Sequence, residues 1–445
     1  MNNILDEIII PNIDEIRGNI TLPDYIGNVA VNWSSDRPEV ISDVDNGCLK
    51  KGVVNRTDSD VTVKLTASVN MDGKEYVKVF TCNVLKAPAA ITEDDFGGYI
   101  FGHFIGEQTK ESEQIYFAIS SDGLNFIDMN GCKPVLVSDI GEKGVRDPYL
   151  CRSYEGDRIF LVATDLSIHN RGGWFINEQG YYDPSTTGSS YLIVWESTDM
   201  VHWSEAKAIK VAPENAGMAW APEMIYNDET GEYVIFFSSS IMNPETKMKA
   251  KPNTIFYVTT RDFVHFSDTR IFIDCQTDGE PSGKAREIID TTVLKIGDYY
   301  YSASKDGDNA EANGGIRILK TKNLLDADSW VKVLDLDELG IDLSEVDVDV
   351  LDNSTLEGPE LFMYNRKDWA NPDVPEYGLM ADRYAHDSGY LPLKTTDIED
   401  VTNERGSWTL LKPEEYSFDK LKKRHGTILR ITNSELEYLT KELGE

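Results

Sequence analysis

A short pattern returns five times along this chain and restricts its fold more than any other feature. Each copy follows a stretch of strand-forming residues, contains a small residue with Asp or Asn, and ends after several apolar positions in an aromatic residue. The final aromatics are Phe126, Trp203, Phe266, Trp330 and Trp408. A strand-rich unit of this size cannot bury both of its own faces, so its repetition favours blades stacked around an axis. Five copies predict an all-β chain whose main domain is a five-bladed β-propeller.

Most repeats also open with a comparable strand, which begins at Asp147, Pro222, Asp290 or Glu357. The fifth repeat must be assembled differently, because Phe126 precedes the strand at Asp147 and the last strand, from His425, follows the final copy. The sequence therefore predicts a fifth blade shared by the two ends of the domain. Such sharing would seal the sheet edges that a propeller otherwise leaves open.

Polar residues occupy the start of these opening strands, which line the central channel of a propeller. The pattern predicts that Asp147, Glu223, Asp290, Glu357 and His425 share one register and converge near the axis. Single acids at strand ends are usually solvated, but several acids aligned by a repeat favour a functional carboxylate cluster.

Converging carboxylates without a Ser-His or Cys-His pair suit the hydrolysis of glycosidic bonds. One protonated acid gives its proton to the leaving oxygen, and one ionised acid activates water or attacks carbon. Neighbouring carboxylates push their pKa values apart, which supplies one acid and one base. Trp220 lies just before this register and is either a platform for a sugar face or a core residue.

The first 90 residues differ in pattern from the repeats. Short runs alternate apolar and polar positions, as in residues 61–66 and 76–80, with a turn signal at 71–73. This alternation predicts a small antiparallel β-sandwich in which Trp33 belongs to the core. Residues 86–90 are small and contain Pro88, which suits a linker. We therefore expect two domains, over residues 1–90 and 91–445.

The charge balance restricts the partners of the chain. Asp and Glu number 77 against 43 Lys and Arg, which gives a formal net charge of −34. This charge repels phosphate backbones and anionic lipids, so neither nucleic acid nor a membrane is an expected partner. No apolar run reaches the roughly 18 residues that a membrane span needs.

The start of the chain and its cysteines bear on location. The first ten residues lack the basic start and apolar core of a secretory signal. Five scattered cysteines, Cys48, Cys82, Cys132, Cys151 and Cys275, favour reduced, buried thiols over a disulfide framework. We expect a cytoplasmic protein, or a secreted one if a signal peptide has been trimmed; its oligomeric state is open.

Several short motifs, taken in order, resemble glycoside hydrolase family 43. They are VRDPY at 145–149, WAPE at 220–223, IID at 288–290, LEGPEL at 356–361 and RHGT at 424–427. Residues 33–42, with Asn46-Gly47 and the run 61–69, resemble the bacterial immunoglobulin-like modules that accompany polysaccharide-degrading enzymes. The resemblance implies an inverting mechanism, with Asp147 as general base, Glu357 as general acid, and Asp290 tuning the pKa and orientation of that acid.

The same resemblance suggests further residues of the site. The tryptophan motif of the family often ends in Asp, so Glu223 is expected to line the pocket rather than to act as a catalyst. Family members frequently hold a calcium ion in the channel near a histidine, which makes His425 the metal candidate or else a hydrogen-bonded channel histidine. Arg383 either reaches the site or forms a surface ion pair with Asp382 or Asp387, and Asp165 is a further pocket candidate.

These features lead us to expect an exo-acting, inverting α-L-arabinofuranosidase that acts on hemicellulose-derived oligosaccharides from arabinan or arabinoxylan. A β-xylosidase or a β-galactofuranosidase of the same family is an alternative, which the loops near residues 168–190 would decide. A propeller that binds carbohydrate without cleaving it is a further alternative, because the fold hosts many functions.

Overall fold

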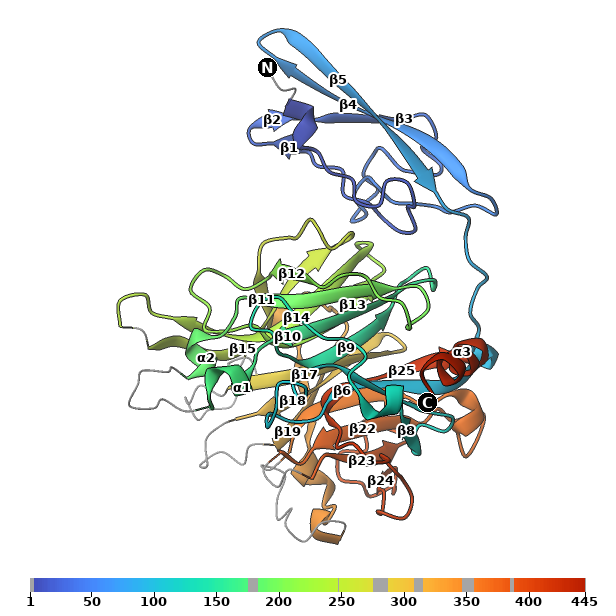
Figure 1. Cartoon of the computed structure of the whole chain (residues 1–445), viewed down its shortest axis with the longest axis vertical. Helices are drawn as coiled ribbons and strands as arrows, with labels where there is room; N and C mark the ends of the chain where they lie inside the picture. The colour runs from blue at the N-terminus through green and yellow to red at the C-terminus, as the bar shows by residue number, and fades with distance from the viewer. Residues whose placement is uncertain are drawn as a thin grey trace.

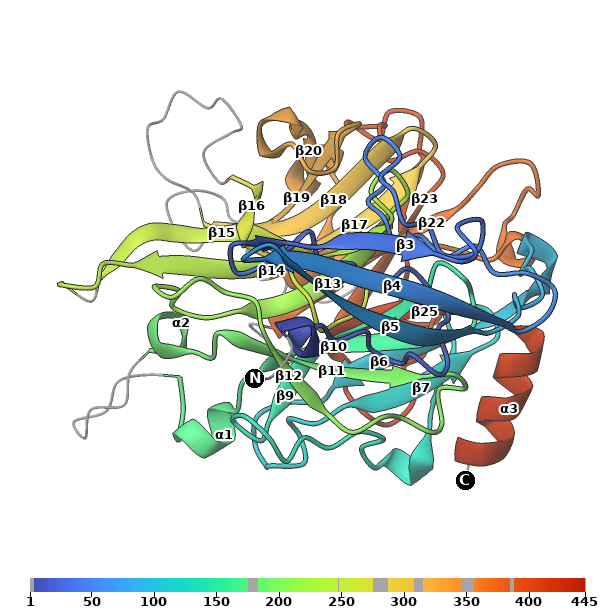
Figure 2. The ribbon, with the colours of Figure 1, turned by 90° about the horizontal axis from the view of Figure 1, so that it is seen from above.

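The computed structural model describes residues 4–174, 183–246, 248–274, 287–307, 315–345, 356–384 and 388–444. The chain is predominantly β-structure. Figure 1 shows the first residues (blue) as a layer above a larger body formed by the rest of the chain. Figure 2, turned by 90°, shows β4 and β5 of that layer crossing over the body. Among the described residues, no helix combines the length and the apolar character that a membrane crossing needs.

The layer, which we call the amino-terminal module (residues 4–90), is built around one long hairpin. Alternate residues of its first long strand, from Val63 to Val69, are buried, as expected for a sheet with one face on the core. Asp72 and Gly73 form its two-residue turn with φ of 52° and 76°. The strands are β1 (Tyr25–Ile26), β2 (Val29–Ala30), β3 (Asn32–Ser35), β4 (Val61–Met71) and β5 (Lys74–Val84).

The module has a hydrophobic core of its own. The buried cluster runs from Leu5 to Val84 and includes no residue of the larger body. Trp33 packs against this cluster with its ring centroid 5.8 Å from that of Phe80, and its indole N–H donates to the carbonyl of Pro23 at 2.9 Å. The prediction that Trp33 is a core residue is therefore confirmed.

The remaining residues, which we call the main body (residues 91–444), contain five four-stranded antiparallel sheets within the described part of the chain. Each sheet is written here from its innermost strand outwards. The sheets are β9 (Val145–Arg152), β10 (Ile159–Asp165), β11 (Tyr191–Ser197), β12 (Lys207–Lys210); β13 (Trp220–Asn227), β14 (Glu232–Met242), β15 (Lys249–Thr260), β16 (Arg270–Ile273); β17 (Ile288–Ile296), β18 (Tyr299–Asp306), β19 (Gly315–Thr321), β20 (Val331–Asp335); β21 (Glu357–Met363), β22 (Tyr377–Asp382), β23 (Tyr390–Thr395), β24 (Trp408–Leu410); and β25 (Arg424–Thr432), β6 (Phe96–Phe104), β7 (Tyr116–Ser120), β8 (Phe126–Asp128).

The five sheets are arranged around their innermost strands. β9 contacts β13 and β25, β17 contacts β13 and β21, and β21 also contacts β25. The last strand, β25, pairs antiparallel with β6, the first strand of the main body, as the sequence predicts. The arrangement is therefore of the propeller type, and one of its sheets joins the two ends of the main body.

The repeated sequence pattern forms the turn between the third and fourth strands of a sheet. Asp122, Asp199 and Asp262 each accept hydrogen bonds from the backbone amides two and three residues further on, at 2.7 to 3.0 Å. A short carboxylate side chain can satisfy these amides in place of a backbone carbonyl. This role explains why the acid stands at a fixed distance before the aromatic residue.

Few helices accompany the sheets. The α-helices of the described residues are α1 (Ile168–Arg171), α2 (Pro184–Thr187) and α3 (Asn433–Leu443), and short 3-10 helices include Ile4–Glu7, Glu93–Asp95, Asn130–Cys132, Ala327–Ser329, Leu336–Leu339, Leu343–Glu345 and Arg366–Asp368. Helix α3 packs on β6 and β25. Its Glu435 accepts two hydrogen bonds from Arg152 of β9, at 2.6 and 2.7 Å, which joins the end of the chain to the neighbouring sheet.

The cysteines agree only partly with expectation. The four that the structure describes are free, but Cys82 alone is buried, whereas Cys48 is exposed and Cys132 and Cys151 are half-buried. Cys275 lies outside the described residues. The expectation of reduced thiols holds for these four, and the expectation that they are buried is wrong for Cys48.

Polar contacts connect the module to the main body. The buried guanidinium of Arg261, in the turn after β15, donates to the carbonyls of Lys50 and Lys51 in the module and of Thr230 in the main body, at 2.8 to 3.1 Å. Asn19 donates to the hydroxyl of Tyr226 at 3.2 Å. Hydrogen bonds of this kind need both partners in place, so they fix the module in one position.

We predict that Arg261→Met loosens the module from the main body. The change leaves three carbonyls without their charged donor, and each such hydrogen bond contributes about 2 kcal/mol. The rate at which a protease cuts the linker at residues 86–90 should therefore rise, and the melting temperature should fall. Arg270→Met, which alters an exposed arginine of β16, is the matched control. Equal cleavage of both variants and the parent protein would contradict the role of Arg261.

Candidate functional site

The five innermost strands share a β-bulge at the same place. In each strand two residues lie opposite one residue of the next strand, so the register shifts there. The first bulge residue has a positive φ of 45° to 53° in four of the strands, at Asp147, Ala221, Asp290 and Gly358. This conformation is easy for glycine, tolerated by Asp and strained for Ala. Such strain collects at functional sites.

The bulge corrects the predicted register of the site. Asp147, Asp290 and His425 are first bulge residues and occupy equivalent positions. Glu357 lies one residue earlier in its strand, and Glu223 lies after the bulge. The prediction that all five share one register is therefore wrong, because Glu357 and Glu223 stand on either side of the bulge whose first position the other three occupy.

His425 lies between the two bulge aspartates. Its Nδ1 is 3.5 Å from Oδ1 of Asp147 and 3.9 Å from Oδ2 of Asp290. The other oxygen of Asp147 accepts a hydrogen bond from the hydroxyl of Thr164 at 2.9 Å. Oδ2 of Asp290 accepts from the backbone amide of Gly358 at 3.2 Å. The structure thus brings together three of the predicted site residues and orients both aspartates.

The carboxyl group of Asp290 is deeply buried, and its pKa reflects this. Burial raises the pKa of Asp290 to about 6, and the negative charges of Glu357 and Asp147 act in the same direction. His425 and Lys305 act in the opposite direction and lower the pKa of Asp290. Asp290 can therefore hold or release a proton near neutral pH, which is the range in which acid–base chemistry needs it.

Glu357 lies between two cations. Its carboxylate is 3.3 Å from Nη2 of Arg424 and 3.5 Å from Nζ of Lys305. Arg424 also donates through Nε to the buried carboxylate of Asp382. Lys305 stands 3.8 Å from the ring centroid of Tyr384. These contacts hold the glutamate beside Asp290.

Arg424 occupies the place that the sequence reasoning considered for Arg383. The guanidinium of Arg383 donates to the carbonyls of Ser388, Gly389 and Tyr390, at 2.9 to 3.2 Å, and so braces its own loop. Asp382 pairs with Arg424, and Asp387 lies outside the described residues. Arg424 is the residue before the bulge in β25, just as Glu357 is the residue before the bulge in β21. Knowledge of the bulge at His425 would therefore have identified Arg424 as the equivalent of Glu357.

Two tryptophans lie near Arg146, the residue before Asp147. The rings of Trp220 and Trp174 are 6.0 Å apart and nearly perpendicular. The indole of Trp174 donates to Glu107 at 2.6 Å, and Arg146 binds the same carboxylate at 2.9 Å while its guanidinium lies 5.1 Å from the Trp174 ring. Trp220 is equivalent in register to Arg146 and is half-buried. Trp174 was not singled out from the sequence, because no repeat marks its position.

Glu223 lies one layer deeper in the channel than the bulge residues. It is equivalent in register to Glu360, and both are buried. Burial raises the pKa of Glu360 to about 8 and that of Glu223 well above its ordinary value. One oxygen of each carboxyl has no hydrogen-bond partner among the described residues. Glu223 is thus a channel residue beneath the site.

Asp165 acts on a loop. It is buried at the end of β10, and it accepts a hydrogen bond from the amide of Glu142 at 2.7 Å. Gly141 lies so close that a Cβ there would be 2.3 Å from the Asp165 carboxylate, and its φ is +59°. Glu142 in turn binds Arg171 at 2.6 Å. Asp165 therefore orders residues 141–142 beside the site.

The surroundings of His425 bear on the predicted calcium ion. Calcium takes six to eight oxygen ligands. Among the residues that the structure describes, no three His, Cys, Asp or Glu side chains are grouped so as to hold a metal ion. An ion near His425 would therefore need most of its ligands from groups other than these side chains, such as water.

Comparisons with known proteins bear on the same residues. A family model for a probable glycosyl hydrolase domain, related to glycoside hydrolase family 43, matches residues 94–437, and a model for an atrophied bacterial Ig domain matches residues 10–87. An α-L-arabinofuranosidase from Bifidobacterium longum subsp. longum is 30% identical over 392 residues, which cover 80% of this chain and 35% of that protein. The chain thus spans about a third of the length of this curated relative.

Solved structures with a similar arrangement include two bacterial enzymes. The exo-β-1,3-galactanase of Clostridium thermocellum is 16% identical with a TM-score of 0.39, covering 62% of this chain and 51% of its own. The α-L-arabinofuranosidase of Lactobacillus brevis is 14% identical with a TM-score of 0.39, covering 67% of this chain and 92% of its own.

The family matches confirm both resemblances seen in the sequence. The motifs that carry the first, from Val145 to Thr427, all lie inside residues 94–437. Those that carry the second lie inside residues 10–87. The chain belongs to the family of probable glycosyl hydrolase domains related to glycoside hydrolase family 43, and it carries an atrophied bacterial Ig domain ahead of that domain.

Proposed function

We propose that this chain is an inverting, exo-acting α-L-arabinofuranosidase that releases terminal arabinofuranose from oligosaccharides of arabinan or arabinoxylan. The observation that carries the proposal is the group of Asp147, Asp290 and Glu357 at one end of the innermost strands, with a basic side chain beside each. The similarity to a named arabinofuranosidase supports the choice of sugar. In this proposal residues 1–90 and 91–445 are two domains, and the five sheets are the blades of a closed propeller.

Asp147 is proposed as the general base. The hydroxyl of Thr164 orients one of its oxygens. Arg146 and His425 lie 3.9 and 3.5 Å from the other. An ionised, oriented carboxylate can take a proton from water as that water attacks the anomeric carbon.

Glu357 is proposed as the general acid that protonates the leaving oxygen. Once the proton has left, Lys305 and Arg424 stabilise the resulting carboxylate. Asp290 lies close enough for the two acids to interact, since the negative charge of Glu357 raises the pKa of Asp290. We therefore assign to Asp290 the tuning of the acid, and to the amide of Gly358 the orientation of Asp290.

The substrate contacts are proposed on the aromatic side of Asp147. Trp220 and Trp174 offer apolar ring faces to a sugar, and the indole N–H of Trp220 has no hydrogen-bond partner among the described residues. That N–H is buried, so the proposed contact of Trp220 with a sugar is made by its ring face. The calcium ion near His425 stays a prediction, and any such ion would be held largely through water.

The proposal is tested by asking which sugar is released and in which configuration. Nitrophenyl α-L-arabinofuranoside, β-D-xyloside and β-D-galactofuranoside are offered in turn, and the first-formed sugar is followed by NMR. We expect turnover of the arabinofuranoside with inversion at the anomeric carbon. Net retention would contradict water attack assisted by Asp147, and preference for another glycoside would replace the proposed sugar.

We predict that Glu357→Gln loses far more activity on substrates with poor leaving groups than on activated ones. Proton donation matters less when the leaving group departs easily, and general acid catalysis contributes on the order of 100- to 10,000-fold. The measurement is kcat/KM on a nitrophenyl arabinofuranoside and on an arabino-oligosaccharide. Asp147→Asn is the comparison, because loss of the base should reduce both rates alike. Equal losses for Glu357→Gln on the two substrates would remove it from the acid role.

We predict that Asp290→Asn makes the protein more stable at pH 8 while it abolishes activity. The pKa of Asp290 is raised to about 6, so the ionised form is unfavourable in the folded state. The resulting penalty is absent below about pH 4, grows between pH 4 and 6, and reaches about 3 kcal/mol above that range. Denaturant midpoints of the variant and parent should therefore coincide at pH 4 and separate at pH 8.

Asp262→Asn provides a control of opposite sign. Burial opposes the shift, but hydrogen bonds from His265 hold the pKa of Asp262 below its ordinary value. Its ionised form therefore stabilises the fold above about pH 4, and the variant should be less stable than the parent at neutral pH. If Asp290→Asn were also less stable at pH 8, burial would not dominate at that carboxyl.

A further inference from the structure

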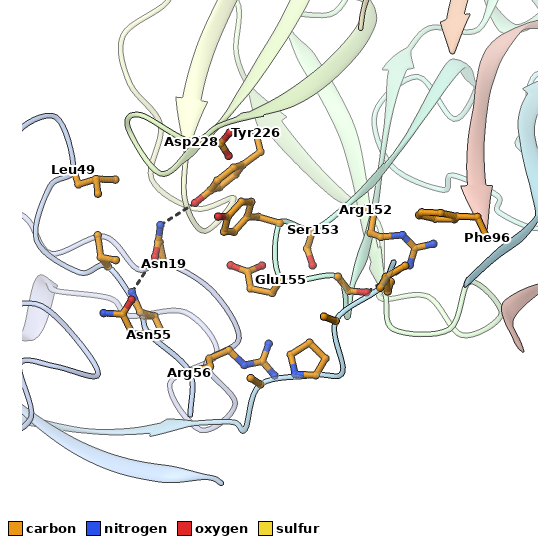
Figure 3. A pocket seen from close by; sticks show the side chains of 18 residues that line it. Asn19, Leu49, Asn55, Arg56, Phe96, Arg152, Ser153, Glu155, Tyr226 and Asp228 are labelled. Carbon is orange, nitrogen blue, oxygen red and sulfur yellow. Dashed lines mark hydrogen bonds between the residues drawn. The ribbon is translucent and has the colours of Figure 1, made fainter. Parts of the chain in front are cut away.

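A groove runs between the amino-terminal module and the main body, away from the site described above. Its cavity has a volume of about 660 Å³. The module contributes Asn19, Asn55 and Arg56 to one wall, and the main body contributes Tyr154, Glu155 and Tyr226 to the other. Figure 3 shows Glu155 lying between the two walls. Pockets that hold small molecules have volumes in this range.

The main-body wall presents a rigid aromatic surface. Tyr154, in the turn after β9, stacks on Tyr226 of β13 with ring centroids 4.3 Å apart and planes 19° from parallel. Its backbone amide donates to the hydroxyl of Tyr233 at 3.1 Å, and the hydroxyl of Tyr226 accepts from Asn19. Tyr154 is nevertheless 63% exposed. One ring face is therefore supported from behind while the other remains open to the groove.

Polar groups stand beside this surface. Oε2 of Glu155 is buried and has no hydrogen-bond partner among the described residues. Arg158 is its nearest cation, at 3.8 Å, which is too far for a hydrogen bond. The side chain of Glu155 is 14% exposed and lines the groove, so the accessible part of its carboxylate can accept a hydrogen bond from a hydroxyl group of a ligand.

Three of the four charged side chains that line the groove, all but Glu155, form ion pairs within the protein at hydrogen-bonding distance, and the four comprise two cations and two anions. Arg56 binds Asp157 at 2.8 Å, Arg152 binds Glu435 at 2.6 Å, and Asp228 binds Lys295 at 3.1 Å. No surplus of one sign remains to attract an ion, and the formal charge of −34 disfavours anions in general. An open aromatic face with hydrogen-bonding groups at its edge matches a neutral ligand that has both apolar faces and hydroxyl groups.

We propose that this groove is a second carbohydrate-binding site, which holds a neutral section of the polysaccharide away from the reacting end. A sugar ring packs on the open face of Tyr154, and one of its hydroxyl groups donates to Glu155. The proposal rests on the proposed function only for the identity of the sugar. The module contributes by forming the opposite wall, so both domains build the site.

The test compares how variants migrate in native gels that contain arabinan, arabinoxylan or galactan. All proteins carry Glu357→Gln, so that the glycan is not degraded during the run. We expect at least one glycan to retard the parent, and Tyr154→Ala to bind it about tenfold more weakly. Tyr154→Phe keeps the ring and should bind like the parent. Tyr25→Ala is the matched control, since Tyr25 is 64% exposed on the module and lies outside the groove.

Two outcomes would overturn the site: equal retardation of Tyr154→Ala and the parent, or no retardation of the parent by any of the three glycans. Hydrolysis of nitrophenyl arabinofuranoside, measured with Tyr154→Ala in the otherwise native chain, separates this site from the catalytic one. It should remain at the parental rate. A different result is that the native chain hydrolyses none of the nitrophenyl glycosides while the Tyr154-dependent retardation persists. That result would contradict the proposed function but would support carbohydrate binding in the groove.

Discussion

The bulge in each innermost strand is the constraint on which the site depends. In a regular strand consecutive side chains point to opposite faces, so one residue per strand would reach the end of the channel. The bulge lets two consecutive residues contribute. Glu357 and Arg424 come from the position before it and contact each other, whereas Asp147, Asp290 and His425 come from its first position and form a second group. Two sets of chemical groups thus meet at one end of five strands.

This geometry carries a cost in stability. Non-glycine residues in the left-handed region are unfavourable by about 1 to 3 kcal/mol each, and Asp147, Ala221 and Asp290 all adopt it. Burial adds an electrostatic cost at Asp290, where only part of the charge is compensated by His425 and Lys305. Among the described residues, no cation contributes to the environment of the deeper pair, Glu223 and Glu360. These features lower the stability of the fold, and they are the same features that arrange the carboxyl groups of the site.

The arrangement of the sheets could be predicted from the sequence, whereas most contacts of the site residues could not. The repeat is visible because Asp122, Asp199 and Asp262 must each stand at a fixed distance from the amides they bind. The sheet shared by β25 and β6 could be predicted because the first copy of the repeat precedes the first opening strand and the last strand follows the final copy. The register of the site was not predictable, because the bulge depends on a backbone conformation that only Gly358 signals, whereas Ala221 adopts it without any sequence cue.

The residues around the acids were missed for a related reason. Lys305 and Trp174 reach the site from a second strand and from a loop, so neither falls on the repeated opening strand. The motif at residues 424–427 points to His425. Nothing in the sequence favours Arg424 over Arg383 as the arginine of the site. The structure distinguishes the two by their partners. Arg424 binds carboxylates of the site, and Arg383 binds carbonyls of its own loop.

The amino-terminal module adds to the main body by position rather than by a binding surface of its own. Its one tryptophan, Trp33, belongs to its core. The contacts of Arg261 with the module and of Asn19 with the main body are hydrogen bonds, and hydrogen bonds hold two surfaces in register while leaving space between them. That space is the groove in which Tyr154 is exposed. A module with a large apolar contact surface would have buried Tyr154, so the polar attachment is what keeps its ring open.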